Sequence, residues 1–205
     1  MVGPAEIFTI FFVTLGPLKI LGPFAQRTHG LDDAMARKVA MWAFIIATIA
    51  AVAGSLIGRA ILEKWHVSIG AMAIAAGIIF FLVALRQLLE QYEPAHVTES
   101  APLPASPTAA AMRLLFPVVL TPYGIATVII LLAASTEAQR TEVILALLVG
   151  VMILNFVAML FARRILVGLT MVVLQVLGAV LGVLQVALAI QFILRGLELL
   201  GLIGG

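Results

Sequence analysis

Six stretches of about 20 mostly apolar residues run along this chain, and short polar segments that carry most of its charges separate them. An α-helix needs about 20 apolar residues to cross the hydrocarbon core of a bilayer. We therefore expect an all-α membrane protein with six transmembrane helices. The windows are Ile7–Ala25, Val39–Gly58, Val67–Leu85, Leu114–Ala134, Val143–Ala162 and Val172–Leu194.

The composition agrees with a location in lipid. Of the 205 residues, 63% are hydrophobic and 11% are charged, whereas soluble domains are about 45–50% apolar and about 25% charged. This excess predicts the lipid bilayer as a partner and excludes a soluble enzyme and a disordered chain. A net charge of +2 is too small to indicate a basic surface that binds nucleic acid, so we expect no nucleic-acid partner.

The polar residues also argue against catalysis. The chain has no cysteine, and its three histidines, His29, His66 and His96, all lie between the apolar windows. No window holds a pair of acidic residues or residues at the spacing of metal ligands. We expect no enzyme activity, no cofactor and no metal site.

The chain divides into two similar halves. Its longest separator is rich in Pro, Ser, Thr and Glu, which predicts a linker loop at 94–111 between three-helix repeats at 1–93 and 112–205. Three landmarks recur at nearly one spacing: Gly16-Pro17 and Thr121-Pro122 are 105 residues apart, Arg59-Ala60-Ile61-Leu62 and Arg163-Arg164-Ile165-Leu166 are 104 apart, and Arg86 and Arg195 are 109 apart.

An odd number of spans in each half has a topological consequence. The second half must enter the membrane from the opposite side, which predicts a 3+3 inverted-topology repeat, an architecture common among transporters. Separators one, three and five carry seven Lys and Arg residues, against four in the remaining polar segments. The positive-inside rule then predicts that the N- and C-termini lie outside.

Helices 1 and 4 are predicted to be broken at corresponding Gly and Pro positions. Proline removes a backbone donor and frees carbonyls in the preceding turn, and paired broken helices in two repeats point to a substrate-binding site. A pair of purely structural kinks is the alternative. The candidate substrate-binding residues are Thr14, Gly16, Pro17, Lys19, Gly22 and Pro23 in the first half, and Thr121, Pro122, Tyr123 and Gly124 in the second.

Lys19 is a charged side chain well inside an apolar window. A lysine at the centre of a membrane helix costs about 2.5–3.5 kcal/mol on insertion scales. Three interpretations stay open: the side chain snorkels toward the helix end, it is a neutral amine bonded to a freed carbonyl, or it is a fixed cation for an anionic group of the solute.

Two amides and one glycine pair complete the candidates. Asn155 and Gln185 lie within apolar windows and are predicted either to pack between helices or to line the substrate site. Gly54 and Gly58 form a GxxxG pair that favours close helix contact, within one protomer or in a homo-oligomer.

These motifs resemble the MarC family of bacterial inner-membrane proteins. The resemblance covers nearly the whole chain and is most specific at Gly16–Phe24, Val67–Leu89, FPVVLTPYGIATVII at Phe116–Ile130 and QFILRGLELL at Gln191–Leu200. It implies six helices, a repeated proline motif and transport of neutral amino acids. Family members typically have Asn-Pro where this chain has Gly16-Pro17, so the family's motif asparagine is not available here.

Together these features predict a transporter of a small solute, an amino acid or a small organic anion, with its site between broken helices 1 and 4. The expected location is the bacterial inner membrane. A passive channel, or a membrane module that assembles without transporting, remains the alternative. No phosphate-binding loop is present, so coupling would be to an ion gradient or absent.

Overall fold

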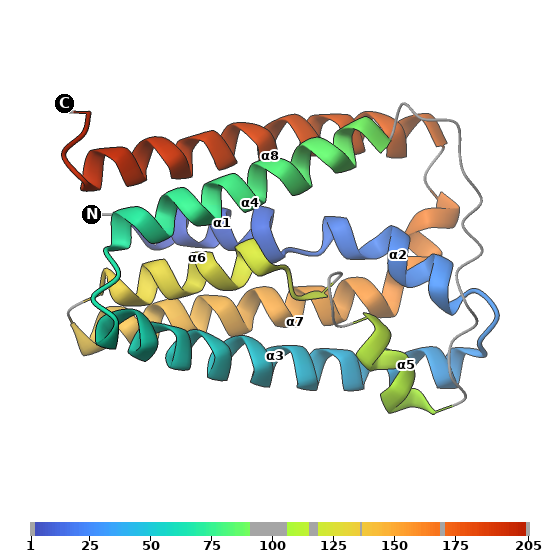
Figure 1. Cartoon of the computed structure of the whole chain (residues 1–205). Helices are drawn as coiled ribbons and strands as arrows, with labels where there is room; N and C mark the ends of the chain where they lie inside the picture. The colour runs from blue at the N-terminus through green and yellow to red at the C-terminus, as the bar shows by residue number, and fades with distance from the viewer. Residues whose placement is uncertain (1–2, 91–105, 115–118, 136, 169–170, 204–205) are drawn as a thin grey trace. The chain divides into compact units, whose positions relative to one another are not determined.

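The computed structural model describes residues 3–90, 106–114, 119–135, 137–168 and 171–203. Within these residues the chain is all α-helical, with no strands (Figure 1). The helices are α1 (Pro4–Leu15), α2 (Leu18–Thr28), α3 (Asp33–Lys64), α4 (Ile69–Glu90), α5 (Pro107–Leu114), α6 (Pro122–Ala133), α7 (Ala138–Gly168) and α8 (Met171–Leu199).

Five helical segments are long and apolar enough to cross a membrane, and they fall on five of the six predicted windows. In the window Leu114–Ala134 the structure describes α6, a helix of 12 residues, which is shorter than a span requires. The five segments are Pro4–Thr28, Asp33–Lys64, Ile69–Arg86, Ala138–Leu166 and Gly178–Leu199.

The long helices extend past their apolar windows. Helix α3 has 32 residues and includes Arg37 and Arg59, both of which lie in the predicted polar separators. Helix α7 has 31 residues and likewise includes Arg163. The physical reason is that an apolar window marks the hydrocarbon core, while the helix continues through the interface, where long cationic side chains reach water.

Side chains and glycine define several helix ends. The backbone N–H of Gly3 donates to Glu6 Oε2 at 2.9 Å before α1, and that of Met35 donates to Asp32 Oδ1 at 2.6 Å before α3. Both contacts satisfy donors that a helix N-terminus leaves open. After α8, Gly201 has a φ of +69°, the left-handed conformation that closes many helices.

The chain packs as two compact units. The first comprises Met1–Val52, Val97–Thr121 and Leu145–Thr170, and the second comprises Ala53–His96, Pro122–Ile144 and Met171–Gly205. Each unit draws residues from both predicted halves, so the units are a division by packing and the halves stay a prediction from the repeat. In the predicted linker, residues 94–105 lie outside the described residues, and Pro107 begins α5.

In the second unit, α4 packs against α6 and α8 with close backbone contact. A Cβ atom built on Gly70 would lie 2.8 Å from Gly196 O, and one on Gly196 would lie 2.7 Å from Gly70 O. A Cβ on Gly77 would lie 2.9 Å from Ala189 O. These glycines let the α4 and α8 backbones touch, a contact that the sequence pattern did not predict.

The two glycines of the predicted GxxxG pair have different surroundings. A Cβ on Gly58 would lie 2.4 Å from Ile129 Cδ1, so Gly58 packs against α6 in the second unit. Around Gly54, no atom lies within 4 Å of the added Cβ position. Gly58 therefore serves a contact within the chain, and the homo-oligomer stays a prediction.

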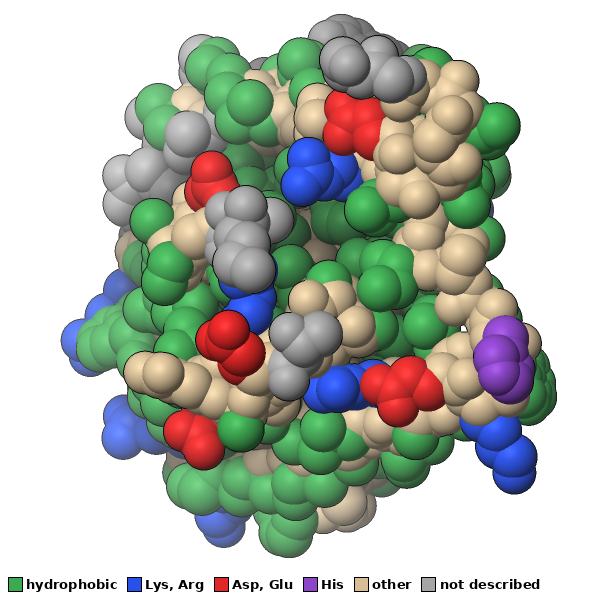
Figure 2. Space-filling model, turned by 90° about the vertical axis from the view of Figure 1, so that its left-hand side faces the viewer, with side chains coloured by type: hydrophobic (Ala, Val, Ile, Leu, Met, Phe, Trp, Pro, Cys, Tyr) green, Lys and Arg blue, Asp and Glu red, His purple; other side chains and the backbone are tan. Residues whose placement is uncertain are grey.

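Many large apolar side chains lie on the protein surface, as expected where lipid replaces water. Figure 2 shows one face on which Lys and Arg side chains lie next to Asp and Glu side chains, with hydrophobic side chains between them. Across the described residues, the highly exposed apolar side chains include Ile49 at 63%, Leu82 at 60% and Val183 at 58%.

Candidate functional site

The first candidate span is interrupted near its middle. Helix α1 has 12 residues and ends at Leu15, and α2 has 11 residues and begins at Leu18. Between them, Gly16 is extended, with φ −74° and ψ 176°. Pro17 explains the interruption, because proline lacks an N–H, clashes with the preceding helical turn and disfavours a helical conformation in the residue before it.

The carbonyl groups at the end of α1 bond to side chains from three other segments. Lys19 Nζ, in α2, donates to Thr14 O and lies 3.4 Å from Thr121 Oγ1. The Thr121 hydroxyl donates to Thr14 O at 3.1 Å. Asn155 Nδ2, in α7, donates to Leu15 O at 2.7 Å. All five residues belong to the first unit, and we call them the interruption site.

The interruption site has a defined electrostatic character. The C-terminus of a helix carries partial negative charge, which favours a cationic or hydrogen-donating group beside it. Of the three interpretations of Lys19, the observed contacts match a hydrogen bond from its amine to a freed carbonyl. The charge state of this amine and its role toward a solute stay predictions.

Asn155 contributes a second polar atom to the interruption site. Its side chain is 1% exposed, and its Oδ1 atom has no hydrogen-bond partner among the described residues. A buried acceptor left without a donor costs about 1–3 kcal/mol. The site therefore offers a buried acceptor that a donor from water or a solute would satisfy.

The remaining predicted residues of the first half differ in environment. Gly16 has no room for a side chain, since a Cβ would lie 1.8 Å from Phe12 O. Gly22 and Pro23 lie inside α2, where Gly22 is exposed and Pro23 is partly buried. Gly16 thus shapes the interruption, whereas Gly22 and Pro23 make no recorded polar contact in the interruption site.

The predicted residues Pro122, Tyr123, Gly124 and Gln185 belong to the second unit. Pro122 begins α6, and the buried Tyr123 ring stacks on Phe80, with centroids 4.2 Å apart and planes 14° apart. Gly124 is buried, and Gln185 on α8 is 6% exposed. Their roles in substrate binding stay predictions.

The interruption site gathers several polar groups. The groups that meet there are two main-chain carbonyls, the Thr121 hydroxyl, an amide and an amine, all of which can form hydrogen bonds. Across the described residues, no group of three or more His, Asp or Glu side chains could hold a metal ion.

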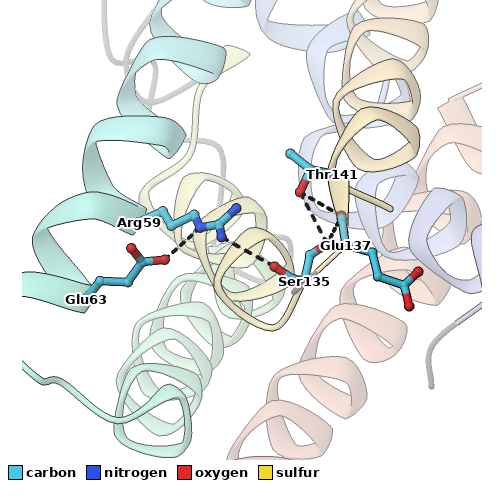
Figure 3. Close-up of polar contacts among 5 residues, drawn as sticks. All are labelled: Arg59, Glu63, Ser135, Glu137 and Thr141. Carbon is cyan, nitrogen blue, oxygen red and sulfur yellow. Dashed lines mark hydrogen bonds and ion pairs between the residues drawn. The ribbon is translucent and has the colours of Figure 1, made fainter. Parts of the chain in front are cut away.

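Near the end of α3, Arg59 connects that helix to the segment between α6 and α7. Its Nε lies 2.8 Å from Glu63 Oε1, and its Nη2 donates to Ser135 O at 3.4 Å (Figure 3). Ser135 Oγ in turn contacts Glu137 O at 3.2 Å and Thr141 Oγ1 at 3.3 Å. We call these five residues the Arg59 corner.

Near the end of α7, Arg163 connects that helix to the segment between α2 and α3. Its Nη2 donates to Leu31 O at 2.8 Å and to Thr28 O, and its Nη1 lies 3.1 Å from Asp33 Oδ1. We call these four residues the Arg163 corner, which lies in the first unit.

The two corners have equivalent residues at the same spacing in the sequence. Arg59 and Arg163 are 104 residues apart, and the residues whose carbonyls they bind, Leu31 and Ser135, are also 104 apart. The two arginines were predicted as landmarks of the repeat. Their binding partners were not predicted, since a main-chain carbonyl leaves no signal in a sequence.

Comparison with known proteins agrees with the expected family. The MarC family of integral membrane proteins matches residues 4–200, which confirms the resemblance. A UPF0056 membrane protein of Methanocaldococcus jannaschii is 27% identical over 197 residues, covering 93% of this chain and 94% of that protein. No solved structure matches the chain.

Proposed function

This chain belongs to the MarC family of integral membrane proteins, and we propose that it carries a small polar solute across the membrane. The proposed solute class is an amino acid or a small organic anion. The interruption site is the part of the protein that we assign to binding.

The observation that carries the proposal is the set of contacts at the interrupted span. Freed carbonyls at membrane depth must bond to protein, water or a ligand, so irregular backbone there is tolerated where it lines a cavity or is buried. Here Thr14 O and Leu15 O bond to side chains of Lys19, Thr121 and Asn155. Interrupted helices of this kind form the substrate sites of many transporters.

Each polar residue of the interruption site has a proposed role. Lys19 would exchange its bond to Thr14 O for the carboxylate of the solute, as a fixed cation. Asn155 Oδ1 would accept a hydrogen bond from an N–H or O–H group of the solute. Thr121 would hold Thr14 O while Lys19 binds the solute. The second-unit candidates Tyr123 and Gln185 are assigned to the same pathway by prediction alone.

The corners support the proposed 3+3 inverted repeat. Arg59 binds a main-chain carbonyl between α6 and α7, and Arg163 binds one between α2 and α3. The two arginines and the two carbonyls have the same spacing of 104 residues. A repeat that preserves a contact as well as a sequence favours two halves of common design. In this proposal the protein lies in the bacterial inner membrane with both termini outside.

Transport by reconstituted protein tests the proposal. The purified chain in liposomes is supplied with labelled neutral amino acids and small carboxylates, and uptake is followed against concentration. Saturable uptake with counterflow is the expected result for a carrier. Flux that stays linear with concentration would indicate a passive channel, and no flux across the panel would indicate a membrane module without transport.

Matched threonine variants test the assigned site. Thr121→Val removes the hydroxyl that bonds to Thr14 O, and uptake efficiency is expected to fall about tenfold, since a lost buried hydrogen bond costs about 1–3 kcal/mol. Thr127→Val is the control, because the Thr127 hydroxyl bonds within α6, to Tyr123 O at 2.7 Å. Equal losses in both variants would contradict the assignment.

Lys19 and Tyr123 are tested in the same assay. Lys19→Ala is expected to reduce saturable uptake of carboxylates more than that of uncharged solutes, since it removes the proposed cation. Tyr123→Phe removes one hydroxyl and keeps the ring that stacks on Phe80. If both variants transport like the unmodified protein, the site lies elsewhere.

A further inference from the structure

A cavity of about 700 Å³ lies beside the Arg163 corner in the first unit. It is formed by the end of α2, the start of α3 and the last turns of α7, and its volume is within the range of small-molecule sites, about 300–1,000 Å³. We call it the Arg163 cavity. Its lining residues are Phe24, Asp33, Ala36, Arg37, Met159, Leu160, Phe161, Arg163 and Arg164.

The charges of the Arg163 cavity are unbalanced. Arg163 pairs with Asp33 at 3.1 Å, so these two opposite charges offset each other. Arg37 and Arg164 are exposed and have no hydrogen-bond or ion-pair partner within the described part of the chain. Two arginines whose charges are not offset favour an anion, and guanidinium groups bind phosphate oxygens in pairs of hydrogen bonds.

The cavity also has an apolar wall that reaches the protein surface. Leu160 is 38% exposed and Phe161 is 47% exposed, while Phe24 and Met159 are buried. A free phosphate ion would leave this wall without a partner. A molecule with an anionic head and a hydrocarbon tail would contact both parts of the lining.

We propose that the Arg163 cavity binds an anionic phospholipid. The phosphate lies between Arg37 and Arg164, and the first part of an acyl chain lies against Leu160 and Phe161. Basic pockets between membrane helices bind such headgroups, and each Lys or Arg near an anionic surface strengthens binding several-fold. In the predicted orientation this cavity faces the cytoplasmic side, where anionic lipids gather.

Lipid retention by the full chain in detergent tests the proposal. Native mass spectrometry counts the bound phosphatidylglycerol and the bound phosphatidylcholine with the same acyl chains, and thermal unfolding is measured with each lipid. Phosphatidylglycerol is expected to bind at least about tenfold more tightly and to raise the unfolding temperature. Equal binding of both lipids would overturn the proposal.

Charge-matched variants locate the lipid. Arg37→Gln combined with Arg164→Gln is expected to weaken phosphatidylglycerol binding about 10- to 30-fold. The control is Lys38→Gln combined with Arg195→Gln, which removes the same charge from exposed residues that do not line the cavity. An equal loss in the control would show general attraction to the protein surface and would overturn the proposal.

Two further measurements keep the test decisive. Inorganic phosphate is expected to give less than a tenth of the protection given by phosphatidylglycerol at equal concentration, and equal protection would identify a free-anion site instead. Arg164→Gln alone is measured as well, so that the test still holds if the double variant does not fold. It is expected to weaken phosphatidylglycerol binding about fivefold, and unchanged binding in this folded variant would overturn the proposal.

Discussion

The Arg59 corner and the Arg163 corner share one contact, an arginine bound to a main-chain carbonyl, and differ in the other groups around the arginine. Each arginine binds a carbonyl at the repeat-equivalent position, Ser135 or Leu31. Arg163 binds a second carbonyl, that of Thr28, and an acidic residue in another helix. Arg59 pairs instead with Glu63 one turn along its own helix.

The difference extends to the neighbouring positions. At the spacing of 104 residues, Arg37 and Arg164 of the Arg163 cavity correspond to Thr141 and Ala60. Thr141 bonds to Ser135 and Glu137, so it holds the Arg59 corner together without adding charge. The two corners therefore share one contact, an arginine bound to a main-chain carbonyl, while exposed arginines line a cavity only beside Arg163 among the described residues.

Removing the arginine from each corner gives the largest expected difference. Arg163→Gln should lower the free energy of unfolding by about 2–3 kcal/mol, because the buried Thr28 carbonyl and the Leu31 carbonyl lose a charged donor. Arg59→Gln should cost about 0.5–1 kcal/mol, since it breaks one long carbonyl contact and one surface pair. Unfolding in mixed micelles measures both, and equal losses would remove the distinction between the corners.

Adding charge to the Arg59 corner tests whether an arginine at this position is enough to favour an anionic lipid. Ala60→Arg introduces the residue type found at the equivalent position, Arg164. This change should tighten phosphatidylglycerol binding about fivefold, close to 1 kcal/mol. Ala60→Gln is the control, as it adds a long side chain without charge. A gain of the same size in Ala60→Gln would mean that shape, and not charge, separates the corners.

The acidic residues of the two corners should respond unequally. Asp33→Asn removes the carboxylate from the Arg163 cavity and should strengthen phosphatidylglycerol binding about threefold. Glu137→Gln should leave lipid binding within about twofold, because Glu137 contributes its main-chain carbonyl to the Arg59 corner (Figure 3). Native mass spectrometry measures both, and a weaker-binding Asp33→Asn would contradict the proposed phosphate position.

The smallest effect is expected for the pair within α3. Glu63→Gln should lower the free energy of unfolding by about 0.3–0.5 kcal/mol, the usual contribution of an i, i+4 pair on a helix surface. The loss should shrink when unfolding is measured in high salt, because salt screens exposed charges. A loss above about 1 kcal/mol would show that Glu63 positions Arg59 for its bond to Ser135.

Hydrophobic patterning predicted the class of fold and most of its spans. The windows follow from the apolar length that a bilayer demands, and five of them contain candidate spans. Helix ends were less predictable, because α3 continues through charged residues such as Arg37 and Arg59. A loss of hydropathy marks the lipid boundary, and it does not mark where the helix stops.

The sequence also predicted part of the interruption site. Thr14, Lys19, Thr121 and Asn155 were all candidates, and the structure brings them together through the carbonyls at the end of α1. Leu15 was missed because it contributes only its main-chain oxygen. Such a contact depends on how distant segments pack, which a single sequence does not encode in any one residue type.

The contact between Gly70 and Gly196 limits the movements open to the second unit. Because each glycine would place an added methyl group against the other's carbonyl oxygen, sliding α4 along α8 would drive the neighbouring side chains into the opposing backbone. The two helices are therefore expected to move together as one rigid body. In the proposed transport cycle the pair would move as a whole, and spin labels on facing positions of α4 and α8 should keep a constant separation throughout it.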